Sequence, residues 1–149
     1  MDCSGERNFA KIYMMLGTCK LCLKEGVQIC NSHIIPEFNY IPCYDEKHRF
    51  IKLTNNGYKN KSLLQKGFRE YMLCEECEVK LSKWEGYAKR ILMDEGISSA
   101  KKFFWGEQLQ GVDYKKFKLY LLSILWRMGV SSLKMFEVVR LGKHQEILR

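Results

Sequence analysis

The spacing of apolar residues changes along the chain from a period of two to a period of three or four. Apolar and polar residues alternate in Val27-Gln28-Ile29-Cys30, which predicts a strand that runs toward His33 and stops before Pro36. After Cys77, apolar residues recur on one helical face: Leu81, Trp84, Ala88, Ile91 and Leu92. This spacing predicts a helix that ends at Gly96.

A second long helix is predicted from Asp113, a favourable N-cap, to Met128. Its apolar face is expected to comprise Phe117, Leu121, Ile124, Leu125 and Met128. Ser131 or Ser132 is expected to cap a further short helix through Phe136, and residues 143–149 form a last turn. The C-terminal part is therefore predicted to be mainly helical.

The remaining segments have weaker patterns. Residues 1–18 show helical spacing closed by a glycine, which predicts a short lead-in helix. Residues 50–53 are expected to form a strand before the turn sequence Asn55-Asn56-Gly57. Residues 101–105 are expected to form a short turn or helix, and the glycines at 106 and 111 to bracket a loop.

The composition is that of a globular protein with a real core and a basic surface. The chain has 149 residues, 46% of them apolar, and 25 Lys and Arg against 17 Asp and Glu, a net charge of +8. This charge favours a polyanionic partner such as nucleic acid. Residues 1–6 are polar, unlike a signal peptide, and the apolar stretch 119–128 is interrupted by Ser123 and Arg127. A cytoplasmic location without membrane contact is expected.

Two cysteine pairs carry the strongest chemical signal. Cys19-Lys20-Leu21-Cys22 and Cys74-Glu75-Glu76-Cys77 each hold two thiols on one turn, the bite that a tetrahedral Zn²⁺ accepts. Together they predict a closed structural zinc site with no position left for substrate. The other three cysteines (Cys3, Cys30 and Cys43) are expected to be buried small hydrophobic residues, because an odd count without an export signal argues against a full disulfide framework.

Seven basic residues and no acidic one lie between positions 47 and 69: Lys47, Arg49, Lys52, Lys59, Lys61, Lys66 and Arg69. The run is either a nucleic-acid-binding surface or a solvated face. Tyr58 and Phe68 interleave with these charges, either as base-stacking residues or as packing. The three tryptophans (Trp84, Trp105 and Trp126) are expected in the core rather than on a stacking platform.

Several motifs, read together, resemble those of the HNH, or His-Me finger, nucleases. They are Ser32-His33-Ile34-Ile35-Pro36 between the cysteine pairs, Tyr71-Met72-Leu73-Cys74-Glu75-Glu76-Cys77-Glu78, Ser82-Lys83-Trp84-Glu85, Phe117-Lys118-Leu119 and Ser123-Ile124-Leu125-Trp126-Arg127. The longer match is to an uncharacterised bacterial family labelled HNH endonuclease. The resemblance implies an α+β fold: a treble-clef, ββα-metal finger on a Cys₄ zinc site over residues 1–97, followed by a helical extension over 98–149.

The resemblance also implies roles for individual residues. His33 stands at the position of the general base. Ser32 and Glu78 stand where the family has ligands of a catalytic divalent metal, here expected to be Mg²⁺ or Mn²⁺, with Glu37 or Glu85 as helpers. Arg69 replaces the usual asparagine and is expected to hold the scissile phosphate.

Three functions remain open at this point. The first is a metal-dependent nuclease of DNA or RNA, in bacterial or phage defence. The second is a catalytically inactive, zinc-containing nucleic-acid-binding module, favoured by the substitutions at 32, 69 and 78. The third is a protein-interaction module or homodimer that uses the C-terminal helices. Outside the resemblance, His33 is a structural histidine or a competing zinc ligand, and Glu75, Glu76 and Glu78 simply favour the start of a helix.

Overall fold

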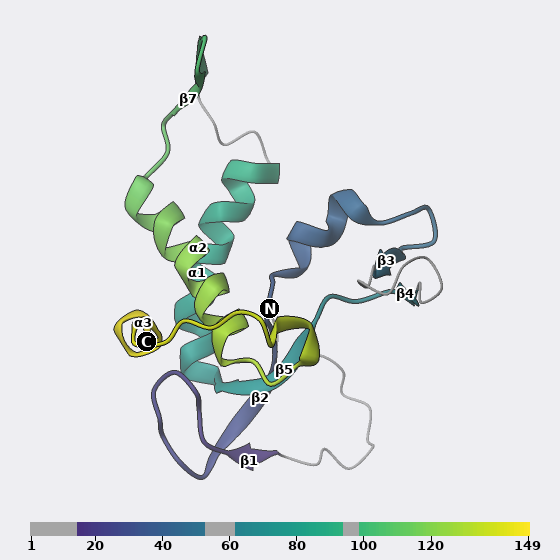
Figure 1. The fold of residues 1–149 in the computed structure, drawn as a ribbon, viewed down its shortest axis with the longest axis vertical. Coiled ribbons are helices and arrows are strands. Elements are labelled where there is room, and N and C mark those ends of the chain that lie inside the picture. The colour runs from purple at the N-terminus through teal and green to yellow at the C-terminus, as the bar shows by residue number, and fades with distance from the viewer. Residues whose placement is uncertain (1–14, 53–61, 94–98) are drawn as a thin grey trace.

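The computed structural model describes residues 15–52, 62–93 and 99–149, and it shows a mixed α+β fold with small antiparallel sheets (Figure 1). The strands are β1 (Leu16–Gly17), β2 (Val27–His33), β3 (Phe50–Lys52), β4 (Ser62–Leu64), β5 (Arg69–Cys74), β6 (Ser99–Phe103) and β7 (Gly106–Gln110). The helices are η1 (Glu37–Cys43), α1 (Glu75–Met93), α2 (Tyr114–Val130), η3 (Lys134–Phe136) and α3 (His144–Leu148). None of the helices in the described ranges has the length and apolar character needed to cross a membrane.

The central sheet has the strand order β1-β2-β5 and is antiparallel. The strand predicted at residues 27–30 is confirmed and continues to His33, with an irregularity in the register between Cys30 and Asn31. Of the lead-in helix predicted for residues 1–18, only residues 15–18 are described, and there the prediction is wrong, because Leu16 and Gly17 pair with β2. The backbone groups of this segment are satisfied by a neighbouring strand instead of by a helical turn.

The helix predicted after Cys77 is confirmed as α1, which begins directly where β5 ends. Its buried face includes Leu81, Ala88 and Ile91, but Leu92 is 49% exposed. Leu92 lies only about 40° around the helix from the buried Ala88, but it stands in the last turn of α1, which ends at Met93. The predicted end at Gly96 lies outside the described residues.

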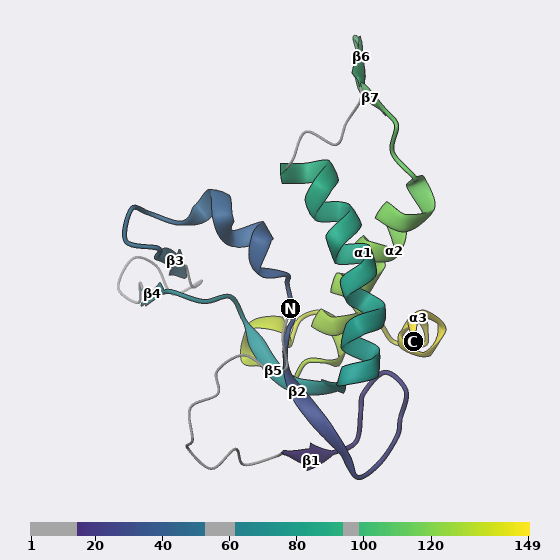
Figure 2. The same cartoon turned by 180° about the vertical axis from the view of Figure 1, so that it is seen from behind.

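The predicted cap of α2 is confirmed, since the Asp113 carboxylate accepts a hydrogen bond from the Lys116 N–H at 3.1 Å. The predicted apolar face is wrong in part: Leu121 and Leu125 are 50% and 39% exposed. The buried positions of α2 are Tyr120, Ser123, Trp126 and Arg127. The helix turns this partly polar face inward because α1 offers polar partners there. The two helices lie side by side in both views (Figures 1 and 2).

Residues 99–110 form an antiparallel hairpin, so the helix offered for 101–105 and the loop predicted after Gly106 are wrong, and the turn offered as the alternative is limited to residues 104 and 105. The pair Phe103 and Gly106 closes a two-residue turn. The hairpin stands out beyond the ends of α1 and α2 (Figures 1 and 2). Trp105 lies at its tip and is 67% exposed, whereas Trp126 is buried as predicted.

The strand predicted at 50–53 is confirmed over residues 50–52 as β3, which pairs with β4, and residue 53 lies outside the described residues. The turn predicted at residues 55–57 and Tyr58 lie outside the described residues. Phe68 is partly buried and makes an edge-to-face contact with Phe136, with ring centroids 5.5 Å apart. This contact favours packing as the role of Phe68.

Candidate metal centre and active site

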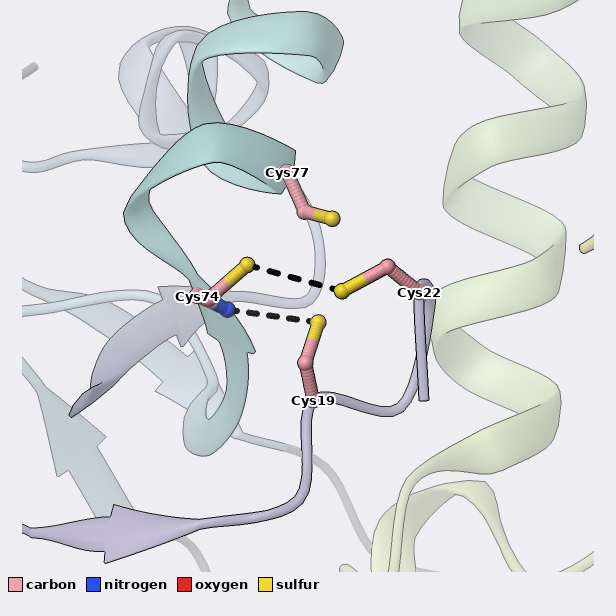
Figure 3. Close-up of side chains that lie close together, drawn as sticks. All are labelled: Cys19, Cys22, Cys74 and Cys77. Atoms are coloured by element: carbon pink, nitrogen blue, oxygen red, sulfur yellow. Dashed lines mark hydrogen bonds between the residues drawn. The ribbon is translucent and has the colours of Figure 1, made fainter. Parts of the chain in front are cut away.

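Four cysteine side chains converge where β5 meets α1 (Figure 3). Their sulfur atoms all lie within 4.8 Å of one another, and the Sγ atoms of Cys22 and Cys74 are 3.7 Å apart. Four sulfurs bound tetrahedrally to Zn²⁺ at about 2.3 Å are separated from one another by about 3.8 Å. The predicted cluster of Cys19, Cys22, Cys74 and Cys77 is thus confirmed as a group that can hold a metal ion, consistent with structural zinc.

A tight turn places the first two thiols on one side of the chain. The Leu23 N–H donates to the Cys19 carbonyl at 2.9 Å, and the Cys19 N–H donates to the Lys24 carbonyl at 2.9 Å. Leu23 has φ 61°, in the left-handed region that favours glycine. The turn therefore holds a leucine in an unfavourable backbone conformation in order to orient Cys19 and Cys22 together.

The electrostatics of the cluster, as a set of four thiolates, favour a bound cation. Burial raises the pKa of Cys19, but N–H groups of Cys22, Cys74 and Leu21 outweigh it and bring the pKa to about 7. Burial also raises the pKa of Cys74 and of Cys77. The sulfurs of Cys19 and Cys22 raise both pKa values further, and Cys77 opposes this rise at Cys74. Four thiolates cannot gather here unless a positive ion offsets their charge, which Zn²⁺ does.

Among the other cysteines, Cys43 contradicts the prediction because it is exposed. Cys30 is half-buried in β2 and is disulfide-bonded, which also contradicts the prediction, and Cys3 lies outside the described residues.

Glu70 connects the first cysteine pair to the end of α2. Its carboxylate lies 2.6 Å from the Lys20 Nζ and accepts hydrogen bonds from the hydroxyls of Ser131 and Ser132. Lys20 also donates to the carbonyl of Val130 at 2.9 Å. These bonds hold the C-terminal end of α2 beside the cysteine cluster.

His33 lies at the end of β2, with 16% of its side chain exposed. Its Nε2 atom is 3.1 Å from Glu37 Oε2, four residues further along the chain. The Glu37 carboxylate also accepts bonds from the Tyr44 hydroxyl and, at 3.4 Å, from the Gly67 N–H. These donors and His33 lower the pKa of Glu37 although burial raises it. The ring of His33 is thus held by an ionised carboxylate.

The pKa of His33 lies below its ordinary value. Burial is the main cause, the Arg69 guanidinium adds to it, and Glu37 opposes both. A lowered pKa keeps the imidazole neutral at physiological pH, which is the form that accepts a proton.

Arg69 is the register partner of His33 across the β2 and β5 pair. Its Nε atom is buried and finds no hydrogen-bond partner within the part of the chain that the structure describes. Directly opposite residues of paired strands project on the same side of the sheet. The structure therefore brings His33, Glu37 and Arg69 together.

Glu78 lies in a different environment. Burial raises its pKa, and the nearby Ser32 hydroxyl and Arg127 guanidinium oppose this effect, while its Oε1 atom finds no hydrogen-bond partner in the described part of the chain. Ser32 and His33 are consecutive residues of a strand, whose side chains point to opposite faces. Across residues 15–52 and 62–93, no hydrogen bond or ion pair joins His33 to Glu78. The structure thus pairs Ser32 with Glu78 and pairs His33 with Glu37.

The Arg127 guanidinium lies near Glu78 and opposes the rise that burial causes in the pKa of that carboxyl. Its Nη1 atom lies 2.7 Å from Glu85 Oε1, and both side chains are almost fully buried. The same Nη1 atom donates to the carbonyl of His33 at 2.8 Å. A single guanidinium therefore ties the end of β2 to α1 and α2, and it already neutralises Glu85, one of the expected metal helpers.

Replacing Arg127 with alanine is expected to destabilise the fold by about 3–5 kcal/mol, because it leaves the Glu85 carboxylate buried without a counter-ion. The measurement is urea unfolding followed by circular dichroism. Replacing both residues with leucine should recover much of the loss, and Arg140→Ala, at an exposed arginine, serves as control. Equal unfolding midpoints for Arg127→Ala and Arg140→Ala would contradict the role of the pair.

The basic run is only partly described. Lys59 and Lys61 lie outside the described residues. Of the other members, Lys52 is on β3, Arg69 is on β5, and the rest lie in the η1–β3 and β4–β5 connections. Arg49 is bound to Asp45, with Nη2 2.8 Å from Oδ2, so part of its charge is neutralised. Lys52 lies over the ring of Phe68, 5.8 Å from its centroid.

Changing Lys59, Lys61 and Lys66 to glutamate is expected to weaken nucleic-acid binding and to lower the slope of log K against log salt by about 2–3, because three phosphate contacts are lost. Fluorescence anisotropy over a salt series measures both quantities. The control is Lys83, Lys89 and Lys143 to glutamate, exposed residues whose reversal changes the net charge equally. If both triple variants bind alike, the run is a solvated face.

A cavity of about 350 Å³ opens beside Cys22 and Cys77, between α1, α2 and α3. Its walls are mostly apolar and include Leu81, Trp84 and Trp126. Neither His33 nor Glu78 borders it. This cavity is therefore separate from the His33 cluster.

Sequence reasoning missed two residues of this site. Glu37 was expected only as a metal helper, although its spacing of four residues from His33 is a signal for contact in a turn or helix. Arg127 was given no role of its own, only a place in a family-like motif and as an interruption of an apolar stretch. An arginine within an apolar helical pattern signals a buried ion pair, since an isolated buried charge is very unfavourable.

Comparisons of this chain with protein-family models, curated proteins and solved structures find no match. The resemblance to HNH nucleases therefore rests on the motifs quoted above. The function has to be inferred from the Cys₄ cluster and from the residues that surround His33.

Proposed function

We propose that this chain is a zinc-stabilised, metal-dependent nuclease that hydrolyses phosphodiester bonds of DNA or RNA, with His33 as general base. The observation that carries the proposal is the contact of a partly exposed His33 with Glu37, opposite Arg69 on the neighbouring strand. A base, a group that orients it and a cation for the phosphate are the parts that such a reaction needs. The treble-clef, ββα-metal classification of the finger belongs to the same proposal.

The contact with Glu37 determines which nitrogen of His33 acts. A neutral imidazole has one N–H and one acceptor nitrogen, and an ionised carboxylate only accepts. Nε2 therefore carries the hydrogen that is donated to Glu37, and Nδ1 keeps the lone pair that takes a proton from the attacking water. The Arg69 guanidinium would bind non-bridging phosphate oxygens through its planar fork of donors.

The catalytic ion of this proposal is Mg²⁺ or Mn²⁺. Glu78 and Ser32 offer oxygen ligands, and water and phosphate oxygens would complete the shell. Such an ion stabilises the charge that develops on the leaving oxygen. The proximity of the Ser32 hydroxyl to the Glu78 carboxylate supports these two residues as ligands from β2 and α1, and the alternation along β2 puts them on the face opposite His33.

The test is cleavage of plasmid DNA and of a structured RNA by the zinc-loaded protein, with Mg²⁺, with Mn²⁺ and with neither ion. Cleavage that depends on the added ion is expected, while the zinc content stays constant. Binding of nucleic acid without cleavage under any of these conditions would contradict the nuclease proposal.

The second candidate is a catalytically inactive nucleic-acid-binding or protein-interaction module. One observation favours it: the buried Arg127 guanidinium bonds to Glu85 beside the Ser32 and Glu78 pair, and like charge opposes a divalent ion there. Isothermal titration with Mn²⁺ separates the two candidates. If the heat of Mn²⁺ binding is the same in wild type and in Glu78→Gln, or is absent from both, the inactive module is favoured.

A further inference from the structure

The β6–β7 hairpin carries three consecutive aromatic residues at its tip. Phe103, Phe104 and Trp105 are 43%, 102% and 67% exposed. The hairpin projects away from the cysteine cluster and beyond the ends of α1 and α2 (Figures 1 and 2). The side chains at its tip therefore form an apolar patch on a protruding element rather than part of the core.

Folding does not account for these residues. The turn between the paired residues Phe103 and Gly106 consists of Phe104 and Trp105 alone. Two-residue hairpin turns favour glycine, asparagine and aspartate, which adopt the required backbone angles at low cost. Aromatic side chains here serve neither turn formation nor burial, and exposed apolar patches of this kind mark contact surfaces.

One face of the hairpin combines a ring platform with polar groups. The rings of Phe103 and Trp105 stack with centroids 4.9 Å apart and an interplanar angle of 11°. Lys101 lies two residues before Phe103 on the same strand and is paired with Gln108, so all three project on one side. We call Lys101, Phe103, Trp105 and Gln108 the ring face.

We propose that the ring face binds unpaired bases of single-stranded nucleic acid. A base stacks on the Trp105 ring, the Lys101 ammonium neutralises a neighbouring phosphate, and the Gln108 amide bonds to a base edge. The proposal rests on the proposed function, for which it names the substrate class. A lipid bilayer fits the surface less well, since an inserting face needs apolar residues where Lys101 and Gln108 stand.

The experiment compares the binding of a fluorescein-labelled oligodeoxythymidylate with that of an abasic oligonucleotide of equal length and charge, by fluorescence anisotropy. The wild-type protein is expected to bind the abasic strand more weakly, because phosphate contacts remain but stacking is lost. Trp105→Ala is expected to weaken binding of the thymidylate about 5- to 150-fold, the equivalent of roughly 1–3 kcal/mol for one stacked base. The same substitution should leave binding of the abasic strand unchanged.

Val138→Ala is the control, because Val138 is an exposed apolar residue outside the hairpin, and it should bind like wild type. Equal binding of both strands by wild type, or equal binding of thymidylate by Trp105→Ala and wild type, overturns the proposal. Sedimentation with vesicles of phosphatidylserine and phosphatidylcholine tests a lipid bilayer as the alternative ligand of the ring face. Trp105-dependent sedimentation with vesicles, without Trp105-dependent thymidylate binding, assigns the ring face to a membrane and also overturns it.

The outcome is separable from that of the nuclease proposal. Base stacking is measured as oligonucleotide binding in the absence of divalent ions. Nuclease activity is measured as strand cleavage by the wild-type protein and by His33→Ala. If the protein cleaves nucleic acid but binds both oligonucleotides equally, only the proposal for the ring face is refuted. If binding depends on Trp105 but no cleavage occurs, only the nuclease proposal is refuted.

Discussion

Replacing His33 with alanine is expected to reduce the rate of nucleic-acid cleavage by about 10²–10⁴-fold, the usual effect of losing a general base. The substitution removes the only imidazole at the end of β2 and leaves the Glu37 carboxylate without its partner. The rate is measured under single-turnover conditions on plasmid DNA and structured RNA, so that the chemical step is separated from product release.

The matched control is His144→Ala, at an exposed histidine that the structure places in α3. It should cleave like wild type. Zinc content, circular dichroism and oligonucleotide affinity of His33→Ala should also stay at wild-type values, because the side chain lies outside the cysteine cluster. Undiminished cleavage by His33→Ala would move the active site elsewhere.

The pH dependence of this reaction has a defined direction. A general base works when it is unprotonated, so cleavage should fall as pH drops through the lowered pKa of His33. Glu37 raises that pKa and Arg69 lowers it. Glu37→Gln should therefore move the acidic limb of the pH–rate profile to lower pH, and Arg69→Gln should move it to higher pH. Identical limbs in the three proteins would show that His33 is not the titrating base.

Cys74→Ser is expected to cause loss of zinc and unfolding of the region formed by β1, β2 and β5. Structural zinc in small fingers contributes on the order of 10–16 kcal/mol of apparent binding free energy, which is folding free energy for the surrounding segment. Cys74 has a double role, because its N–H also donates to Cys19 Sγ at 3.3 Å. Elemental analysis gives the zinc content, and amide hydrogen exchange locates the unfolded segment.

Cys43→Ser is the control for this variant, since Cys43 is a free, exposed cysteine that is not one of the four members of the cluster. It should retain one zinc ion and wild-type protection from exchange. A wild-type protein purified without metal, or with a disulfide inside each cysteine pair, would refute the zinc site itself.

Short-range patterns in the sequence determined the parts of this protein that depend on neighbouring residues. The bite of each C-x-x-C pair, the alternation that makes β2, the Asp113 cap and the spacing within α1 act within a few residues along the chain. Each of these features has the same hydrogen bonds or periodicity wherever it lies in a fold, so local reasoning suffices. They predicted the four ligands of the candidate metal centre, which the structure brings together.

The tertiary structure alone decided which of these groups meet. Leu121 and Leu125 are as apolar as any core residue, yet α2 buries Ser123 and Arg127 because Glu85 on α1 provides a counter-ion. The hairpin over 99–110 depends on pairing between two strands, which a search for helical spacing does not detect. His33 faces Glu37 and Arg69 while its neighbour Ser32 lies near Glu78, since consecutive strand residues point to opposite sides. Such choices depend on which burial and charge pairing are available far along the chain, and these become defined only when the elements pack.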